Sequence, residues 1–218
     1  MPRPREYDEL ELLDDAMETF WSLGYDRTSM DQLVENSGVS RASIYAAYEN
    51  KRDLFLAGLQ RYLDSIVEQN IRRLKEVTPA SHAVRRFFTD MVSASPERLL
   101  RGCLLINSAV QLGTTDRDAA ALIRRAFARV ERVMHERLKE AKNDGDTAAD
   151  LDPKGRARLL MTVLQGLRVM GRVGTDAASM RAAVEAALEG IGRPATKAAK
   201  RTAARAKHTT AGKRREKT

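Results

Sequence analysis

The side chains with the clearest chemistry in this sequence lie close together in one short polar segment. They are two hydroxyls, a guanidinium, a methyl group and an ammonium: Ser40, Arg41, Ala42, Ser43 and Lys51. A guanidinium can donate two hydrogen bonds to the acceptors of a guanine, or it can bind a phosphate, and both interpretations of Arg41 stay open. The ammonium of Lys51 and the backbone N–H groups at a nearby helix start suit a phosphate. The segment therefore indicates contact with DNA.

A helix-turn-helix is the element that would present these groups, and the pattern of residues 16–56 predicts one. Thr28 is expected to cap a first helix, with an acidic residue three positions later completing a capping box. Ser40 is expected to cap a second, shorter helix in which Ile44 and Tyr48 face a core. A short helix held out from a three-helix core is the element that enters a DNA major groove.

Three further side chains near the short helix are candidate DNA contacts. Tyr45 and Tyr48 are expected near the DNA backbone, with packing of Tyr45 in the core as the alternative. Thr28 has two expected roles, as a helix cap and as a phosphate contact. The DNA-binding residues predicted from the sequence are thus Thr28, Ser40, Arg41, Ala42, Ser43, Tyr45, Tyr48 and Lys51.

The same region is similar to the N-terminal signature of the TetR (tetracycline repressor) family of bacterial transcriptional regulators. The similarity covers about a quarter of the chain by motif and rests on many spaced positions: Phe20, Gly24-Tyr25, Thr28-Ser29-Met30, Leu33, Gly38-Val39-Ser40, Ile44-Tyr45, Lys51 and Leu54-Phe55. It implies an all-α homodimer, in which each subunit has an N-terminal three-helix DNA-binding domain and a helical C-terminal domain for an inducer and for dimerisation.

This chain departs from the family pattern at Ala46-Ala47, where many members carry bulky aromatic or histidine side chains. Two potential DNA contacts are therefore missing. Either Arg41 and Ser43 read the operator, with methyl contacts from alanine to thymine, or specificity is modest and a basic tail supplies affinity.

The sequence divides into three expected segments. Residues 1–50 are expected to form the helix-turn-helix domain, residues 51–192 the helical ligand-binding and dimerisation domain, and residues 193–218 a disordered basic tail. The first helix is expected over residues 6–23, with Leu10 among the side chains that face the core.

A long helix from Asn50 to about Lys75 is expected to join the two domains. Later helices are expected to begin at Ser81, Pro96, Asp116, Pro153 and Asp176. The last two are rich in small and apolar residues, which let helix backbones approach closely. Family members pair their last two long helices in a four-helix bundle, so a homodimer through these helices is expected; packing within one chain is the alternative.

The net charge of +8 is distributed unevenly along the chain. Residues 193–218 contain ten basic residues and one acid, whereas residues 1–53 contain six basic residues and twelve acids. Bulk charge therefore does not favour DNA binding by the N-terminal domain, and local placement must bring Arg27, Arg41 and Lys51, together with Arg52, to the DNA side. The tail is either a solubilising end or a tether that binds phosphates regardless of sequence.

Several function classes are disfavoured by what the sequence lacks. No run of about 18 apolar residues occurs and residues 1–10 are polar, so neither a membrane span nor a secretory signal is expected, and the cytoplasm is the expected location. The single cysteine and three distant histidines favour neither a disulfide nor a metal site. No phosphate loop, nucleophile elbow or paired-histidine motif appears, so no enzyme activity and no cofactor is expected.

An unidentified small-molecule inducer is expected in the C-terminal domain, among side chains from helices that surround the central cavity in relatives. The candidates are Tyr62, Phe88, Cys103, Asn107, Gln111, Phe127, Gln165 and Arg168. Arg168 favours an anionic inducer, with a salt bridge to a surface acid as the alternative. Cys103 is either an inert apolar side chain or a thiol that senses electrophiles.

Together these patterns predict a ligand-responsive regulator that binds double-stranded DNA at a palindromic operator as a homodimer. Repression, with release by the inducer, is the expected mode of action. The alternative from the sequence is a nucleoid-associated, largely nonspecific DNA-binding protein driven by the basic tail.

Overall fold

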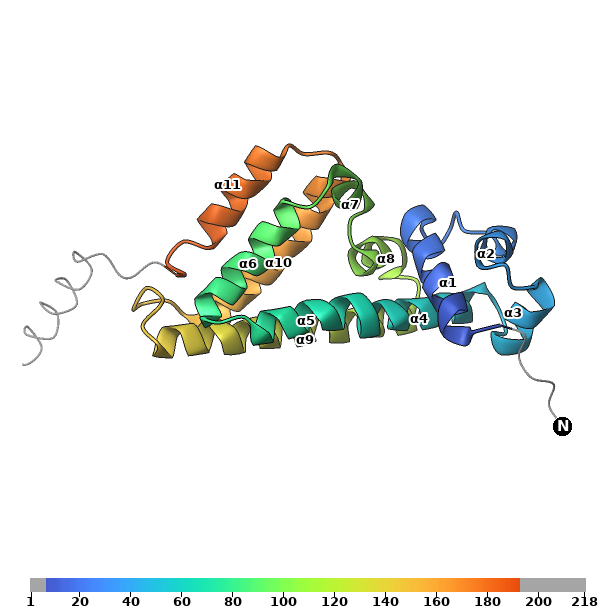
Figure 1. Ribbon diagram of the computed structural model, residues 1–218, viewed down its shortest axis with the longest axis horizontal. Helices are drawn as coiled ribbons and strands as arrows, with labels where there is room; N and C mark the ends of the chain where they lie inside the picture. Colours follow the sequence, from blue (N-terminus) through green and yellow to red (C-terminus); the bar gives the residue numbers. More distant parts are fainter. Residues whose placement is uncertain (1–6, 193–218) are drawn as a thin grey trace, which may run out of the picture.

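The computed structural model describes residues 7–192, and these residues form an elongated array of helices joined by turns (Figure 1). Across that part of the chain, the only strand-like feature is an isolated bridge between Thr147 and Ile191. The expected all-α class is confirmed. The predicted tail at residues 193–218 lies outside the described residues.

Three short helices form one end of the molecule: α1 (Glu9–Leu23), α2 (Met30–Ser37) and α3 (Arg41–Ala47). α1 begins later than expected, because the carboxylate of Asp8 accepts hydrogen bonds from the N–H groups of Leu10 and Glu11. The prediction that Leu10 faces the core was wrong, since this side chain is 56% exposed and the neighbouring Leu12 is buried instead. The later start shows that the polar cap, and not the apolar spacing, fixes the first turn.

The cap of α2 differs from the predicted one by a single residue. Ser29 caps the helix and forms a reciprocal capping box with Gln32. Thr28 is buried, and its hydroxyl donates a hydrogen bond of 2.7 Å to the carbonyl oxygen of Gly24. The prediction of Thr28 as the cap was therefore wrong, because its hydroxyl is already held by the preceding turn. Ser40 caps α3 as predicted.

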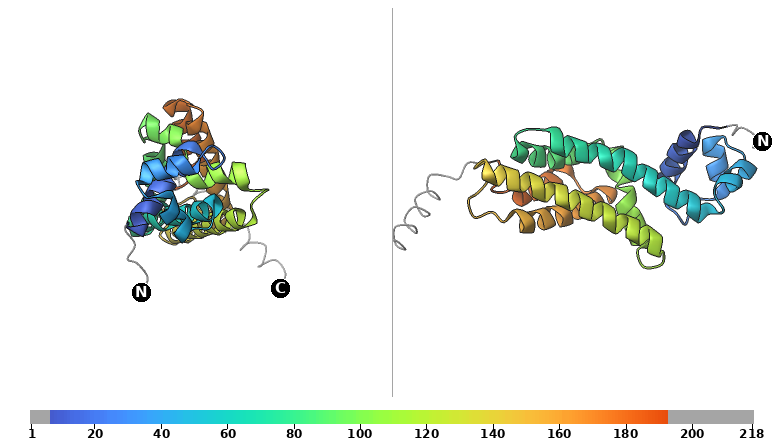
Figure 2. Two further views of the ribbon diagram at one scale, coloured as in Figure 1. Left: turned by 90° about the vertical axis from the view of Figure 1, so that its right-hand side faces the viewer. Right: turned by 90° about the horizontal axis from the view of Figure 1, so that it is seen from below.

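A long helical rod leads from these helices into the rest of the molecule. It consists of α4 (Lys51–Tyr62), one π-helical turn η1 (Leu63–Val67) and α5 (Glu68–Glu76). The predicted helix from residue 50 to about residue 75 is confirmed in extent, including the Asn50 cap. The longest helix, α9 (Arg117–Asn143), lies alongside this rod, as the view from below in Figure 2 shows.

The remaining helices cover the other side of the rod. α6 (Ala80–Val92), α10 (Pro153–Arg172) and α11 (Ala177–Ala187) pack together at the end distant from α3, and α7 (Pro96–Arg101) and α8 (Leu104–Leu112) lie between them and α1 (Figure 1). The proline-led starts of α7 and α10 agree with the sequence. A proline in the first turn leaves no needed N–H unsatisfied.

The buried apolar side chains form two clusters that meet along the rod. One contains residues of α1, α2, α3 and α4 together with residues of α8 and the first half of α9; the other joins α5 and α6 with the second half of α9, α10 and α11. Val67 and Phe127 pack against both clusters. The helix-turn-helix is therefore continuous with the C-terminal helices through its own core, although the predicted domain boundary at residue 50 stays a prediction.

In residues 7–192 there is no helix with the length and apolar character needed to cross a membrane.

Candidate DNA-binding face and ligand cavity

The outer face of α3 carries the polar residues that the sequence singled out. Ser40, Arg41 and Ala42 are exposed, whereas Ile44 is buried and anchors the helix to the core. Tyr45 is 44% exposed, so the alternative that it packs in the core was wrong. α3 therefore presents a short polar surface at the end of the molecule, as a helix that enters a groove must do.

Two of the predicted DNA-binding side chains, Arg41 and Tyr48, interact with carboxylates of neighbouring helices in the free protein. The guanidinium of Arg41 forms an ion pair with the exposed carboxylate of Asp31 on α2. The hydroxyl of Tyr48 donates a hydrogen bond of 3.3 Å to Glu9 of α1, which places Tyr48 at the side of α3. Ser43 is partly buried, and its hydroxyl lies 2.9 Å from that of Ser40. Arg41 is thus at the surface, and its charge is offset by a neighbour in the free protein.

Lys51 lies inside the corner between α1 and α2. Its ammonium donates hydrogen bonds of 3.0 and 2.9 Å to the carbonyl oxygens of Tyr25 and Thr28, and it sits 4.4 Å from the centre of the Tyr25 ring. The structure therefore gives Lys51 and Thr28 a shared role in shaping the loop before α2. Their predicted phosphate contacts stay predictions, and the buried hydroxyl of Thr28 does not reach the surface of the free protein.

Two of the five acids of α1, Asp14 and Glu18, pair with arginines outside the three-helix end. Asp14 accepts two hydrogen bonds from Arg61 of α4, and Glu18 forms an ion pair with Arg101 of α7. Both pairs lie on the side of α1 that faces the rest of the molecule. Local pairing therefore offsets two of these acids, whereas Glu9 stays beside Tyr48 at the side of α3.

Arg52 was expected on the DNA side, and this expectation was wrong. Its guanidinium binds Asp116 through two hydrogen bonds of 2.6 and 2.9 Å and binds Asp118 at 2.6 Å, which ties the start of α4 to the start of α9. The hydrogen bonds from Arg52 hold the pKa of Asp116 below its ordinary value. Asp116 also caps α9 through the N–H groups of Asp118 and Ala119.

Replacing Asp116 by alanine is expected to lower the melting temperature by about 4 °C, because the lost helix cap costs ~1 kcal/mol, which is about 2–4 °C in a chain of this size, and the pairing with Arg52 is lost as well. The change also leaves Arg52 without its least exposed partner. Asp118→Ala is the matched control, since its carboxylate is 71% exposed, and it should change the melting temperature by less than about 2 °C. Thermal unfolding followed by circular dichroism measures both; equal shifts for the two variants would contradict the assigned role of Asp116.

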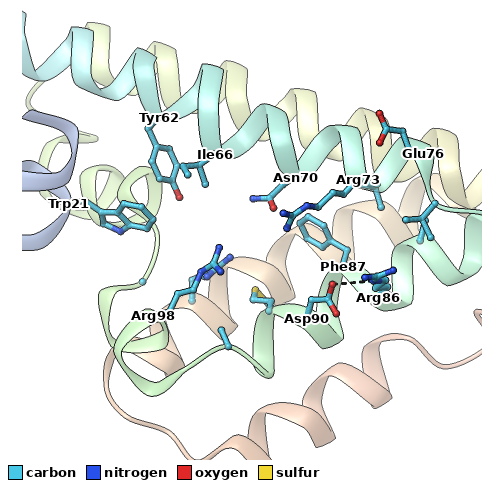
Figure 3. A pocket seen from close by; sticks show the side chains of 17 residues that line it. Trp21, Tyr62, Ile66, Asn70, Arg73, Glu76, Arg86, Phe87, Asp90 and Arg98 are labelled. Atoms are coloured by element: carbon cyan, nitrogen blue, oxygen red, sulfur yellow. Dashed lines mark hydrogen bonds and ion pairs between the residues drawn. The ribbon is translucent and has the colours of Figure 1, made fainter. Parts of the chain in front are cut away.

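A cavity of about 280 Å³ lies between the rod and the helices that cover it (Figure 3). Its walls combine aromatic and aliphatic side chains with several charged groups. They come from α1, α4, η1, α5, α6, α7 and α10, and they include Trp21, Tyr62, Ile66, Asn70, Arg73, Phe87, Asp90, Met91, Arg98 and Arg168. A concave, partly apolar site with a few polar groups is the usual form of a small-molecule site.

Two of the predicted inducer residues line this cavity, Tyr62 and Arg168. Cys103 is directly beside it, because the buried hydroxyl of Tyr62 donates a hydrogen bond of 3.5 Å to its sulfur. Burial raises the pKa of Tyr62 well above its ordinary value, so this phenol stays protonated as a donor. Arg168 forms no salt bridge with any described acid, so the alternative of a salt bridge to a surface acid was wrong.

The structure places the other predicted inducer residues away from the cavity wall. Phe88 is completely buried in the C-terminal cluster, and Phe127 lies where the two clusters meet. Asn107 donates to the carbonyl oxygen of Arg101, and Gln165 is half-buried on α10. None of the four contributes to the wall of the cavity, and the same holds for Gln111.

Gln111 instead links α8 to the DNA-binding end. Its amide oxygen accepts a hydrogen bond of 3.1 Å from the backbone N–H of Tyr25. The contact requires glycine at position 24, because that residue has a φ of 84° and an added Cβ would lie 2.7 Å from the Gln111 amide nitrogen. Gln111 thus joins the corner before α2 to the C-terminal helices.

Sequence reasoning missed most of the polar wall of the cavity, including Trp21, Asn70, Arg73 and Arg98. Trp21 belongs to α1 and was assigned no role, although the chain contains only one tryptophan and that signal was available. Its ring is 8% exposed and stacks under the guanidinium of Arg101 at 3.8 Å. The end of the molecule that contains α3 therefore supplies part of the cavity wall through α1.

No group of three or more metal-ligating side chains converges within residues 7–192.

Two family models match separate segments of the chain. The model described as bacterial regulatory proteins, tetR family, matches residues 12–57. The model described as tetracyclin repressor-like, C-terminal domain, matches residues 80–187. The first segment contains the α3 face, and the second contributes α6, α7 and α10 to the cavity.

Curated relatives align with most of the chain. The HTH-type transcriptional regulator YezE of Bacillus subtilis (strain 168) is 32% identical over 179 residues, which are 81% of this chain and 92% of the relative. The HTH-type transcriptional repressor ComR of Escherichia coli (strain K12) is 29% identical over 176 residues, 80% of this chain and 84% of the relative.

Solved structures show the same architecture. A cysteine mutant of the TetR family transcriptional regulator CifR, complexed with 26bp double-strand operator DNA, superimposes with a TM-score of 0.71 and 30% sequence identity, covering 85% of this chain and 98% of that chain. The reduced form of NemR from E. coli, at 14% identity, has a TM-score of 0.75 and shares the fold.

Proposed function

The chain belongs to the TetR family of bacterial transcriptional regulators, and from this premise we propose that it is a repressor that binds a palindromic operator as a homodimer and is released by a small molecule. DNA-binding regulation follows from the family. The polar outer face of α3 is the single observation in the fold that supports operator reading most directly, because Ile44 anchors the helix while Arg41 and Ala42 stay exposed.

The proposed DNA contacts are the side chains that α3 presents at the surface of the folded domain. Arg41 and Ser43 read base edges or phosphates, and Tyr45 contacts the DNA backbone. Ser40 holds the helix start in position through its cap. Thr28 and Lys51 support the loop before α2, and the relative CifR, solved with operator DNA, supports binding of the family domain to a duplex.

A second copy of the chain is proposed to pair through α10 and α11. Leu159 and Val169 of α10, and Val173 directly after it, are apolar side chains at 47%, 48% and 75% exposure. Ala182 and Ala186 are exposed on α11, where small side chains would allow a partner helix to approach. Clustered apolar side chains at the surface are typical of an interface.

A ligand in the cavity is proposed to change the spacing of the two reading helices. Trp21 of α1 and Tyr62 of α4 both line the cavity, so a bound molecule touches the two helices that carry the helix-turn-helix. Ligand and operator then favour different arrangements of these helices, and each weakens binding of the other. A protein of this kind acts on the chromosome and is neither an enzyme nor membrane-bound, so the cytoplasm is its proposed location.

Selection of bound fragments from random and genomic DNA tests the proposal. We expect one inverted repeat with half-sites about one helical turn apart, or a multiple of it, to be retained at raised salt. A variant without residues 193–218 should keep that preference and show a shallower dependence of affinity on salt, if the ten basic residues of this segment bind phosphates. Loss of all sequence preference at moderate salt would instead favour the nonspecific DNA-binding alternative.

A further inference from the structure

The charged groups of the cavity are distributed unevenly between its two ends. Arg86 and Asp90 form an ion pair of 3.3 Å at one end, and Glu76 also lies toward that end (Figure 3). At the other end, Arg98 faces Trp21 and Tyr62. This second end holds positive charge that the first end does not neutralise.

Three arginines of the cavity wall have no carboxylate partner within the described part of the chain. Arg73, Arg98 and Arg168 form no ion pair with any described acid. They come from α5, α7 and α10, three helices that are distant in sequence. Arg168 lines the cavity together with Tyr62, and its positive charge acts on the Tyr62 hydroxyl. Guanidinium groups that line one cavity without an acid partner are suited to an anion.

A buried donor at the same end has no acceptor. The indole N–H of Trp21 is buried and donates to no described group, and the residue is only 8% exposed. A buried N–H without an acceptor costs free energy, and an acceptor on a ligand would recover it. The indole and the arginines thus favour the same kind of ligand group.

Apolar side chains form a further part of the wall, beside the amide of Asn70. Ile66, Leu74, Phe87 and Met91 line the cavity. A volume of about 280 Å³ admits a small organic molecule and exceeds what an inorganic ion fills. The ligand must therefore carry an apolar body as well as an acid group.

We propose that the cavity binds a small organic acid whose carboxylate is held by Arg98, Arg168 and the indole N–H of Trp21, while its apolar body packs against Ile66, Phe87 and Met91. The inference rests on the proposed function, because it names the chemical class of the inducer. Arg73 adds positive charge at the side of the cavity. Trp21 belongs to α1, so the acid contacts the DNA-binding end directly. Operator DNA should therefore weaken binding of the acid by the same factor by which the acid weakens binding of operator DNA.

The single tryptophan of the chain makes the test specific, because all tryptophan emission arises from this cavity. The full-length protein is titrated with 4-phenylbutanoate, 4-phenylbutanamide and 4-phenylbutylamine, which share an apolar body and differ in the polar group. We expect the acid to shift the emission of Trp21 with a dissociation constant about tenfold or more below those of the amide and the amine. Acetate and inorganic phosphate should have no effect at the same concentrations, since they lack the apolar body.

Two variants and one control assign the carboxylate site. Arg168→Gln and Arg98→Gln should each weaken binding of the acid about tenfold and leave binding of the amide unchanged. Arg98 is exposed, so its variant keeps the test valid should Arg168→Gln fail to fold. Arg158→Gln is the control, because this exposed arginine of α10 pairs with Glu131 and does not line the cavity.

Equal affinity for acid, amide and amine would overturn the proposal, as would acetate or phosphate binding as tightly as the arylalkyl acid. Absence of any acid-dependent change in emission up to ~10 mM, weaker than typical small-ligand affinities, would also overturn it. The measurement contains no DNA. An acid that binds to a protein without operator preference would refute the proposed function alone, and operator preference without acid binding would refute this inference alone.

Discussion

Replacing Leu159 and Val169 of α10 together by glutamate is expected to produce a monomer and to lower operator affinity by ~100-fold or more. Two linked reading helices bind with an effective local concentration that a single helix lacks, and this avidity is worth ~10²–10⁴ in affinity. Both side chains are about half exposed in the single chain, so the change places two charges on the proposed pairing face with little effect on the intrachain core.

Light scattering of the double variant at micromolar concentration measures the subunit number, and a mobility shift with the selected inverted repeat measures affinity. Val110→Glu is the control for the number of subunits. Its side chain is 80% exposed and lies on α8, outside α10 and α11, so this variant should stay dimeric. A double variant that remains dimeric and binds the operator normally would show that α10 is not the pairing helix.

Removing the side chain of Arg41 is expected to weaken operator binding by about 10–100-fold, as lost guanidinium contacts to bases or to phosphates typically do. Arg41 is the exposed cation of α3, and Ala46-Ala47 offer no bulky groups to replace its contact. If the guanidinium reads a guanine, Arg41→Ala relaxes the preference at one base pair. If it binds a phosphate, affinity falls uniformly across sequences.

Asp31, the ion-pair partner of Arg41, gives a matched variant that should change operator affinity in the opposite direction. Asp31 is 88% exposed at its side chain and pairs with Arg41 in the free protein, so it offsets the charge that DNA requires. Asp31→Asn should raise operator affinity about threefold at low salt, and the gain should shrink as salt screens the charges. Fluorescence anisotropy with labelled operator measures both variants. An unchanged affinity in Arg41→Ala would remove this residue from the reading surface.

The sequence predicted local features well where one side chain and its near neighbours decide the outcome. Ser40 and Asn50 cap their helices as expected, because a cap needs only its own side chain and the next N–H groups. The same local logic failed at Thr28. Two adjacent hydroxyls could each cap α2, and the turn at Gly24 engages that of Thr28 and leaves Ser29 to act as the cap.

The candidate site was predicted only in part, because its members meet through helix crossings. Arg52 was expected at the DNA and instead binds Asp116, 64 residues away. The cavity includes Trp21 of α1, which no spacing along the chain connects to Arg98 or Arg168. Phe88 had the expected apolar character but faces the core, since the rotation of α6 sets which aromatic residue reaches the cavity.

By itself the sequence determined the all-α class, the helix-turn-helix and the family, because cap residues and apolar spacing act within a few turns of one helix. Only the tertiary structure decided which charges pair and which arginines stay without a partner. These outcomes depend on how α1, α4, α9 and α10 pack against one another. That packing arises from the two buried clusters as a whole, and residue spacing within one helix does not encode it.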